Sequence, residues 1–133
     1  MKTAILRIDS DARQVDAVIS VLEEHCRASG LTEQETYQLT CAVVEGVNNV
    51  IEHAYNRQPG CPVELRWTQA SNRINVEIRD WGDALAGEPD GAPPASDAEQ
   101  GRGWFIMRQW LDAVDYQRDG DCNRLRLTRH LKP

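Results

Sequence analysis

The sequence contains no apolar run of the roughly 18–20 residues that a membrane-spanning helix requires. Its start has one lysine and a short apolar run broken at Arg7, which is not the pattern of a secretory signal peptide. None of the four cysteines belongs to a CxxC pair, so neither a zinc site nor a disulfide framework is expected. The 15 basic residues are outnumbered by 21 acidic ones, which argues against a nucleic-acid binder. We therefore expect a cytoplasmic protein with no membrane contact and no direct nucleic-acid contact.

The length and composition are those of one ordinary domain. Soluble domains cluster near about 100–150 residues, and this chain has 133, of which 41% are hydrophobic. That is enough for one core, so a fully disordered chain and a two-domain enzyme are both poor fits. We expect a single domain over residues 1–133.

The net charge of −6 is concentrated in residues 83–100, which contain five acidic residues and no lysine or arginine. Without these five, 16 acidic and 15 basic residues remain, a net charge of −1. The segment holds three of the six prolines and only one large apolar residue, so it cannot bury enough surface to offset the entropy cost of ordering. It is either a lid over a site or a plain surface loop.

Periodicity predicts two helices in the first half of the chain. From residue 11 to 29 the apolar residues recur at three- and four-residue steps, and Gly30 ends the helix. Thr32 and Glu35 form a capping-box pattern that opens a longer helix ending near Tyr55. The expected core face of this second helix consists of Leu39, Val43, Val44, Val47, Val50 and Ile51.

The remaining patterns predict strands in adjacent hairpins. A short strand at 3–8 precedes the helices, and alternating apolar residues follow at 63–67 and 74–78. After the acidic segment we expect a third helix over 101–112 and a last hairpin of 114–118 with 124–131. The fold class is therefore α+β: a two-layer α/β sandwich with a mixed, mostly antiparallel sheet and helices on one face.

The second helix carries a polar stripe: Glu45, Asn48, Asn49, Glu52 and His53 lie at offsets of 0, +3, +4, +7 and +8. Asparagine is a poor helix former, so two in mid-helix need a reason. One interpretation is a solvated surface face. The other is a site in which the glutamate acts as a base and an asparagine amide oxygen binds Mg²⁺, which takes few protein ligands beside phosphates.

Two glycine motifs follow. Asp80-Trp81-Gly82 closes a predicted strand, where the carboxylate could accept a hydrogen bond from a ligand that the glycine admits closely. Gly101-Arg102-Gly103 opens the third predicted helix, where free backbone N–H groups could hold phosphate and the arginine could add a charged contact. In isolation, the first could be an ordinary strand end and the second an ordinary loop-to-helix hinge.

Taken together in this order, the motifs resemble those of the GHKL ATPase superfamily, also called histidine-kinase-like ATPases. The chain is most similar to the anti-sigma factor serine/threonine-protein kinases of bacteria. The resemblance runs from about residue 39 to 131 and is strongest in VVEGVNNVIEHAY, GRGWFIMRQWLDAVDY and RLRLTRHL. It implies a Bergerat ATP-binding fold with a mobile lid between the glycine motifs, at residues 83–100 here.

The resemblance implies a role for each motif residue. Glu45 matches the catalytic glutamate and Asn49 the Mg²⁺-binding asparagine, while Asn48 would lie near the α-phosphate or support the site. Asp80 matches the residue that recognises the adenine amino group, and Gly82 would admit the base.

Further positions follow from the same match. Gly101 and Gly103 would line the phosphates, joined by Arg102. His53 and Tyr55 belong to the family pattern, and we expect structural or lid-contact roles for them.

The sequence departs from the family pattern at two places. Asp83-Ala84 follows Gly82 where the family has a second glycine. Cys122-Asn123 stand where the family has Gly-Thr, whose threonine assists adenine recognition.

The leading hypothesis is an ATP-dependent anti-sigma factor and serine kinase that uses Mg²⁺. It would phosphorylate a STAS-type anti-anti-sigma protein, sequester a sigma factor and form a homodimer, all as implied by the resemblance. The alternative is a non-catalytic module in which nucleotide gates partner exchange. The ATPase domain of a histidine kinase fits less well, since no phospho-acceptor histidine with its dimerisation helix precedes the site.

Overall fold

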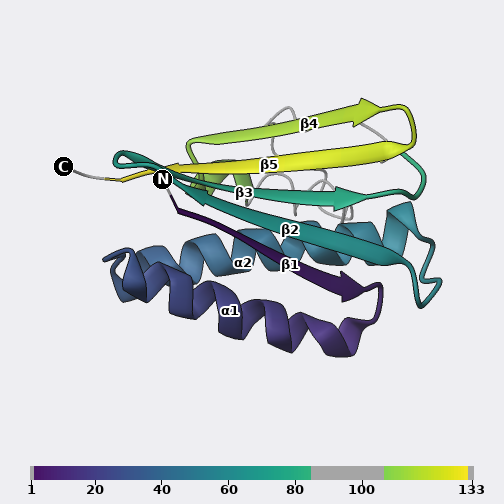
Figure 1. The fold of residues 1–133 in the computed structure, drawn as a ribbon, viewed down its shortest axis with the longest axis horizontal. Helices are drawn as coiled ribbons and strands as arrows, with labels where there is room; N and C mark the ends of the chain where they lie inside the picture. The colour runs from purple at the N-terminus through teal and green to yellow at the C-terminus, as the bar shows by residue number, and fades with distance from the viewer. Residues whose placement is uncertain (1, 85–106, 132–133) are drawn as a thin grey trace.

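The computed structural model describes residues 2–84 and 107–131, which form a five-stranded sheet with helices on one face (Figure 1). The strand order is β1-β2-β3-β5-β4, and every neighbouring pair is antiparallel. The strands are β1 (Lys2–Asp9), β2 (Pro62–Gln69), β3 (Arg73–Asp80), β4 (Ala113–Asp119) and β5 (Cys122–His130). The described sheet is thus wholly antiparallel rather than mixed, because each strand pairs in the antiparallel sense with its neighbour.

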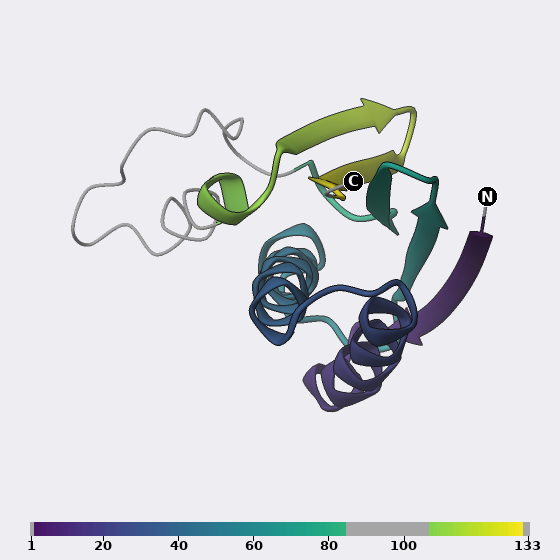
Figure 2. The same ribbon diagram turned by 90° about the vertical axis from the view of Figure 1, so that its left-hand side faces the viewer.

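Two long helices cover the concave side of the sheet (Figure 2). They are α1 (Val15–Ala28), preceded by the 3₁₀ turn η1 (Ala12–Gln14), and α2 (Glu33–Asn49), continued by the π-helical turn η2 (Val50–Ala54). The predicted α+β sandwich is confirmed. No helix among the described residues is both long and apolar enough to cross a bilayer.

The core lies between the helices and the inward-facing side chains of β2, β3 and β5. Leu39, Val43 and Val47 of α2 are fully buried, as are Ile74 and Ile78 of β3. Burying a side chain of this size contributes about 1.5–3 kcal/mol relative to leaving it exposed. The predicted core face of α2 is correct except for Val44, which is half-buried because it borders a groove toward α1 rather than the sheet.

Local signals set the helix boundaries as predicted. Thr32 Oγ1 accepts a hydrogen bond from Glu35 N at 3.1 Å, and Glu35 Oε1 accepts one from Thr32 N at 3.0 Å, which completes the capping box. Gly30 follows α1 with φ +82°, a left-handed conformation in which glycine carries no Cβ penalty.

The end of the second helix differs from the prediction. A regular α-helix to Tyr55 was expected, but the chain widens into η2, where Tyr55 N donates to Val50 O at 2.9 Å. The carbonyl of Ala54 accepts from Asp83 N at 2.8 Å, so the loop after β3 supplies a partner to this helix end. Asn56 and Arg57 then take positive φ angles and turn the chain away.

Several predicted features lie partly or wholly outside the described residues. Of the segment 83–100 only the first two residues are described, and of the helix expected at 101–112 only residues 107–112 are, with 107–110 helical. Gly101, Arg102 and Gly103 lie outside as well.

Candidate functional site

The site is built where the end of α2 packs against the end of β3. A Cβ atom on Gly46 would approach Ile78 Cδ1 to 2.7 Å, so α2 approaches the sheet more closely than a side chain would allow. A Cβ atom on Gly82 would overlap the carbonyl oxygen of Ala54. These two contacts hold the end of α2, which carries Asn49, and η2 against the end of β3, which carries Asp80.

Asp80 carries a buried carboxylate held from two sides. Its side chain is 2% exposed, and Oδ1 accepts hydrogen bonds from Gly82 N at 3.0 Å and Asn123 Nδ2 at 2.8 Å. Burial raises the pKa of this carboxyl group, and the two hydrogen bonds and the charge of Arg118 oppose that rise. Within the described residues every hydrogen bond to this carboxylate goes to Oδ1, which leaves Oδ2 to accept one from a ligand.

Asn123 is the cross-strand neighbour of Asp80 in the β3–β5 pairing and is 1% exposed. Its Nδ2 also lies 3.2 Å from Gly82 O and 3.1 Å from Asp83 O. Its Oδ1 accepts from Arg118 Nη1 at 2.8 Å, and the same Nη1 donates to Gly82 O at 3.0 Å. Asn123 and Arg118 thus hold both the carboxylate and the loop of residues 80–83.

The part played by Arg118 is absent from the sequence-based interpretation. The signal was available in the final hairpin, whose turn at Gly120 pairs Asp119 with Cys122 and therefore Arg118 with Asn123. A side chain directly opposite Asn123 can reach the oxygen that Asn123 turns away from Asp80.

Tyr55 fastens the same loop from the other side. Its hydroxyl accepts a hydrogen bond from Trp81 N at 2.8 Å and donates one to Pro62 O at 2.6 Å. Burial is the main cause that raises the pKa of this phenol. Two hydrogen bonds therefore support a structural role for Tyr55. His53 is exposed, and among the described residues its one ion-pair partner is Glu52 at 3.9 Å.

The residues of the polar stripe differ in burial: those in α2 are buried or half-buried, and those in η2 are exposed. Asn49 is 5% exposed, and its Nδ2 has no hydrogen-bond partner among the described residues. Glu45 and Asn48 are half-buried on α2. Glu52 and His53 lie in η2, where the wider π-helical turn breaks the 3.6-residue spacing assumed for the stripe, and both are exposed.

Gly82 has a structural reason to be glycine that the sequence did not suggest. We expected its missing side chain to admit a ligand, but the space in question is filled by Ala54 O and the ring of Tyr55. The residue therefore lets the loop after β3 lie directly on the end of η2.

This arrangement can bind a ligand that offers a hydrogen-bond donor to a buried carboxylate and an acceptor to a buried amide. An unsatisfied buried amide lowers the stability of the folded protein by about 1–3 kcal/mol, so a ligand atom that accepts a hydrogen bond from Asn49 Nδ2 would recover this free energy.

Comparison with known proteins found a matching family model and two similar protein kinases. A family model described as a histidine kinase-like ATPase domain matches residues 8–129. The serine/threonine-protein kinase BtrW of Bordetella bronchiseptica is 29% identical over 99% of this chain and 96% of its own length. The serine-protein kinase RsbW of Bacillus velezensis is 26% identical over 84% of this chain and 76% of its own.

A solved structure shares the fold. The RsbU and RsbW domains of a Mycobacterium tuberculosis protein align with a TM-score of 0.70 at 15% identity. The alignment covers 98% of this chain and 32% of that longer one, so this chain corresponds to about a third of it.

Proposed function

Because the chain belongs to the histidine kinase-like ATPase domain family, we propose that it is an ATP-dependent protein serine kinase and anti-sigma factor. Its substrate is a STAS-type anti-anti-sigma protein, and phosphorylation of that protein releases the kinase to sequester a sigma factor. The names of the two kinases to which it is similar support this activity. They do not favour the alternative of a non-catalytic module gated by nucleotide.

The observation that carries the proposal is the buried carboxylate of Asp80. A carboxylate at 2% exposure needs compensation, and Gly82 N and Asn123 Nδ2 supply it at one oxygen only. The adenine amino group is a donor that suits the second oxygen. We assign Asp80 to adenine recognition, with Asn123 in the position of the family threonine.

The phosphate end of the nucleotide is assigned to α2 and the second glycine motif. Asn49 is buried, its Nδ2 has no hydrogen-bond partner among the described residues and could donate to a phosphate oxygen, and its side-chain carbonyl oxygen is a ligand type that Mg²⁺ accepts. When bound there, Mg²⁺ would neutralise charge on the phosphates. Asn48 would support this region, and Gly101, Arg102 and Gly103, which lie outside the described residues, are assigned to the phosphates by resemblance alone.

We assign the role of base in the transfer step to Glu45. The serine Oγ of the partner protein forms a bond to the γ-phosphorus of ATP, and the bond from that phosphorus to the β–γ bridging oxygen breaks. The serine proton passes to the Glu45 carboxylate, and ADP leaves with the bridging oxygen. Glu45 is half-buried on α2, one helical turn before Asn49.

The kinase acts as a homodimer, as the resemblance implies. It works in the cytoplasm, where thiols stay reduced, and its four free cysteines support this location. The acidic segment 83–100 serves as the lid over the nucleotide.

The test is incubation with Mg-ATP and the STAS protein encoded nearby, followed by intact-mass measurement of that protein. We expect one phosphoryl group on it with the wild-type kinase and none with Glu45→Ala. Glu52→Ala, at an exposed position of η2, is the matched control and should transfer normally. ATP binding without any phosphoryl adduct would reject the kinase activity.

A further inference from the structure

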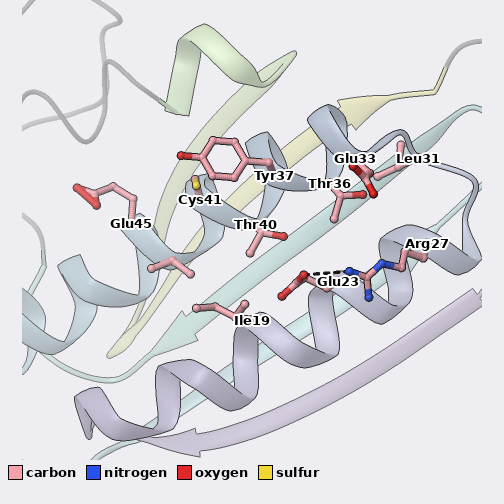
Figure 3. Close-up of a pocket in the computed structure, with 11 residues that line it drawn as sticks. Ile19, Glu23, Arg27, Leu31, Glu33, Thr36, Tyr37, Thr40, Cys41 and Glu45 are labelled. Carbon is pink, nitrogen blue, oxygen red and sulfur yellow. Dashed lines mark hydrogen bonds and ion pairs between the residues drawn. The ribbon is translucent and has the colours of Figure 1, made fainter.

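A groove of about 580 Å³ lies between α1 and α2 (Figure 3). Ile19 reaches into it from α1, while Tyr37 and Cys41 border it on α2. Leu31 lies at one end and Glu45 at the other. The groove therefore leads to the residue that the proposed function makes the base.

The surface of the groove has features of a binding site rather than of ordinary exposed surface. Tyr37 is 63% exposed, one of the large hydrophobic side chains that the described structure leaves open to solvent. Ile19, Leu31 and Val44 line the groove with apolar side chains. An exposed aromatic ring beside apolar walls is a surface that the apolar side chains of a partner can cover.

The charges around the groove select the chemistry of its occupant. Glu23 and Glu33 line it together with Glu45. Among the described residues that line the groove only Arg27 is basic, and it is paired with Glu23 at 3.2 Å. The rim is therefore acidic overall. A complementary occupant carries apolar side chains for the walls and at least one lysine or arginine for the rim.

We propose that this groove binds the serine-bearing segment of the phosphoacceptor protein, a segment with apolar side chains and a basic residue. The inference rests on the proposed function, because it takes Glu45 as the base. The acceptor serine must reach Glu45, and Asn49, on the nucleotide side, lies one helical turn beyond it. A segment lying in the groove ends at Glu45 and so presents its hydroxyl where ATP approaches from the other direction.

Cys41 is a native reporter for occupancy of the groove. With the unphosphorylated partner present at about ten times its Kd and a non-hydrolysable ATP analogue added, we expect alkylation of Cys41 to slow about tenfold, because only the free form reacts. Cys61 is half-buried and does not line the groove, so its alkylation rate should stay unchanged. Unchanged Cys41 reactivity in a sample where the partner is shown to be bound would overturn the proposal.

Other occupants give different results in the same assay. A second copy of the chain would slow Cys41 alkylation as the kinase concentration rises, with no partner present. A sigma factor would protect Cys41 in the absence of the phosphoacceptor. Protection by either of these, with none by the phosphoacceptor protein, would overturn the proposal.

A variant separates this inference from the proposed function. Cys41→Trp fills the groove, and we expect the KM for the phosphoacceptor to rise at least about tenfold, the equivalent of about 1.4 kcal/mol, with ATP affinity unchanged. Ala17→Trp adds the same side chain at an exposed position of α1 outside the groove and should keep the wild-type KM. If the wild-type kinase transfers no phosphate, the proposed function fails. If it transfers phosphate and Cys41→Trp keeps the wild-type KM, only the groove assignment fails.

Discussion

Asn123 Nδ2 lies 2.8 Å from Asp80 Oδ1, and the two residues face each other across the β3–β5 pairing. Asn123, which we propose stands in the position of the family threonine, makes several contacts besides this one. It holds the carboxylate, reaches the carbonyls of Gly82 and Asp83, and is itself held by Arg118. Among the described residues, the carboxylate is therefore engaged through Oδ1 only.

Asn123→Ala should weaken ATP binding by about tenfold or more, since losing a hydrogen bond to a charged group costs about 1.5–3 kcal/mol. Calorimetry with ATP measures the change, and Asn123→Thr should restore part of the affinity. Asn75→Ala is the matched control, because Asn75 also makes a β3–β5 side-chain bond, accepting from Thr128 Oγ1 at 2.7 Å on the other face of the sheet. Wild-type ATP affinity in Asn123→Ala would contradict this role.

Gly82→Ala should destabilise the protein by about 1–3 kcal/mol, the usual cost of overpacking, because the added methyl group meets the Ala54 carbonyl. Urea unfolding without nucleotide measures this loss. Gly120→Asn is the control: nothing lies within 4 Å of a Cβ there, and asparagine tolerates the positive φ of 60°. Equal stability of the two variants would show that the loop moves away from η2 at little cost.

Most of the fold could be predicted because its signals are local. The capping box at Thr32 and Glu35 needs only four residues in sequence. The alternation in β2 and β3 shows which side chains face the helices, and short turns fix which residues pair.

The remaining features depend on contacts between distant parts of the chain. The π-helical turn η2 ends where Ala54 O accepts a hydrogen bond from Asp83 N, and the sequence of the helix alone does not predict this contact. The role of Arg118 depends on the register of two hairpins at once. Glu45, Asn49 and Asp80 could be proposed as site residues because their motif spacing is visible without knowledge of the packing, but the burial of Asn49 and Asp80 was not predicted.

Asn49→Ala should abolish the Mg²⁺ dependence of ATP binding without lowering stability in the absence of nucleotide. The substitution removes an amide whose Nδ2 has no partner in the described structure, so folding loses no hydrogen bond there. Calorimetry with and without EDTA tests the first half, and urea unfolding tests the second. A variant that keeps the EDTA effect would remove Asn49 from the metal site.

Tyr55→Phe should lower the free energy of unfolding by about 1–2 kcal/mol, because Trp81 N and Pro62 O both lose their side-chain partner. The ring itself stays packed, so the effect isolates the hydroxyl. Tyr37→Phe, at an exposed position, is the control and should change stability little. If both variants unfold at the same urea concentration, Tyr55 does not hold the loop through its hydroxyl.

Glu77→Gln should remove part of the stability that the protein has at neutral pH. Glu77 is 9% exposed on the sheet face opposite the helices, beside Arg79 and with Arg126 Nη2 at 3.4 Å. Burial alone would raise its pKa, but the two arginines hold that pKa below its ordinary value of 4.5.

A lowered pKa in the folded state means that the ionised group stabilises the fold above about pH 4.5, and that this contribution disappears as pH falls through the folded-state pKa. The difference in unfolding free energy between wild type and Glu77→Gln should therefore be largest near pH 7 and shrink steadily below pH 4.5. Urea unfolding over a pH series measures it, with Glu24→Gln at an exposed position of α1 as the control. A difference that stays constant with pH would mean that the arginines do not stabilise the ionised form of Glu77.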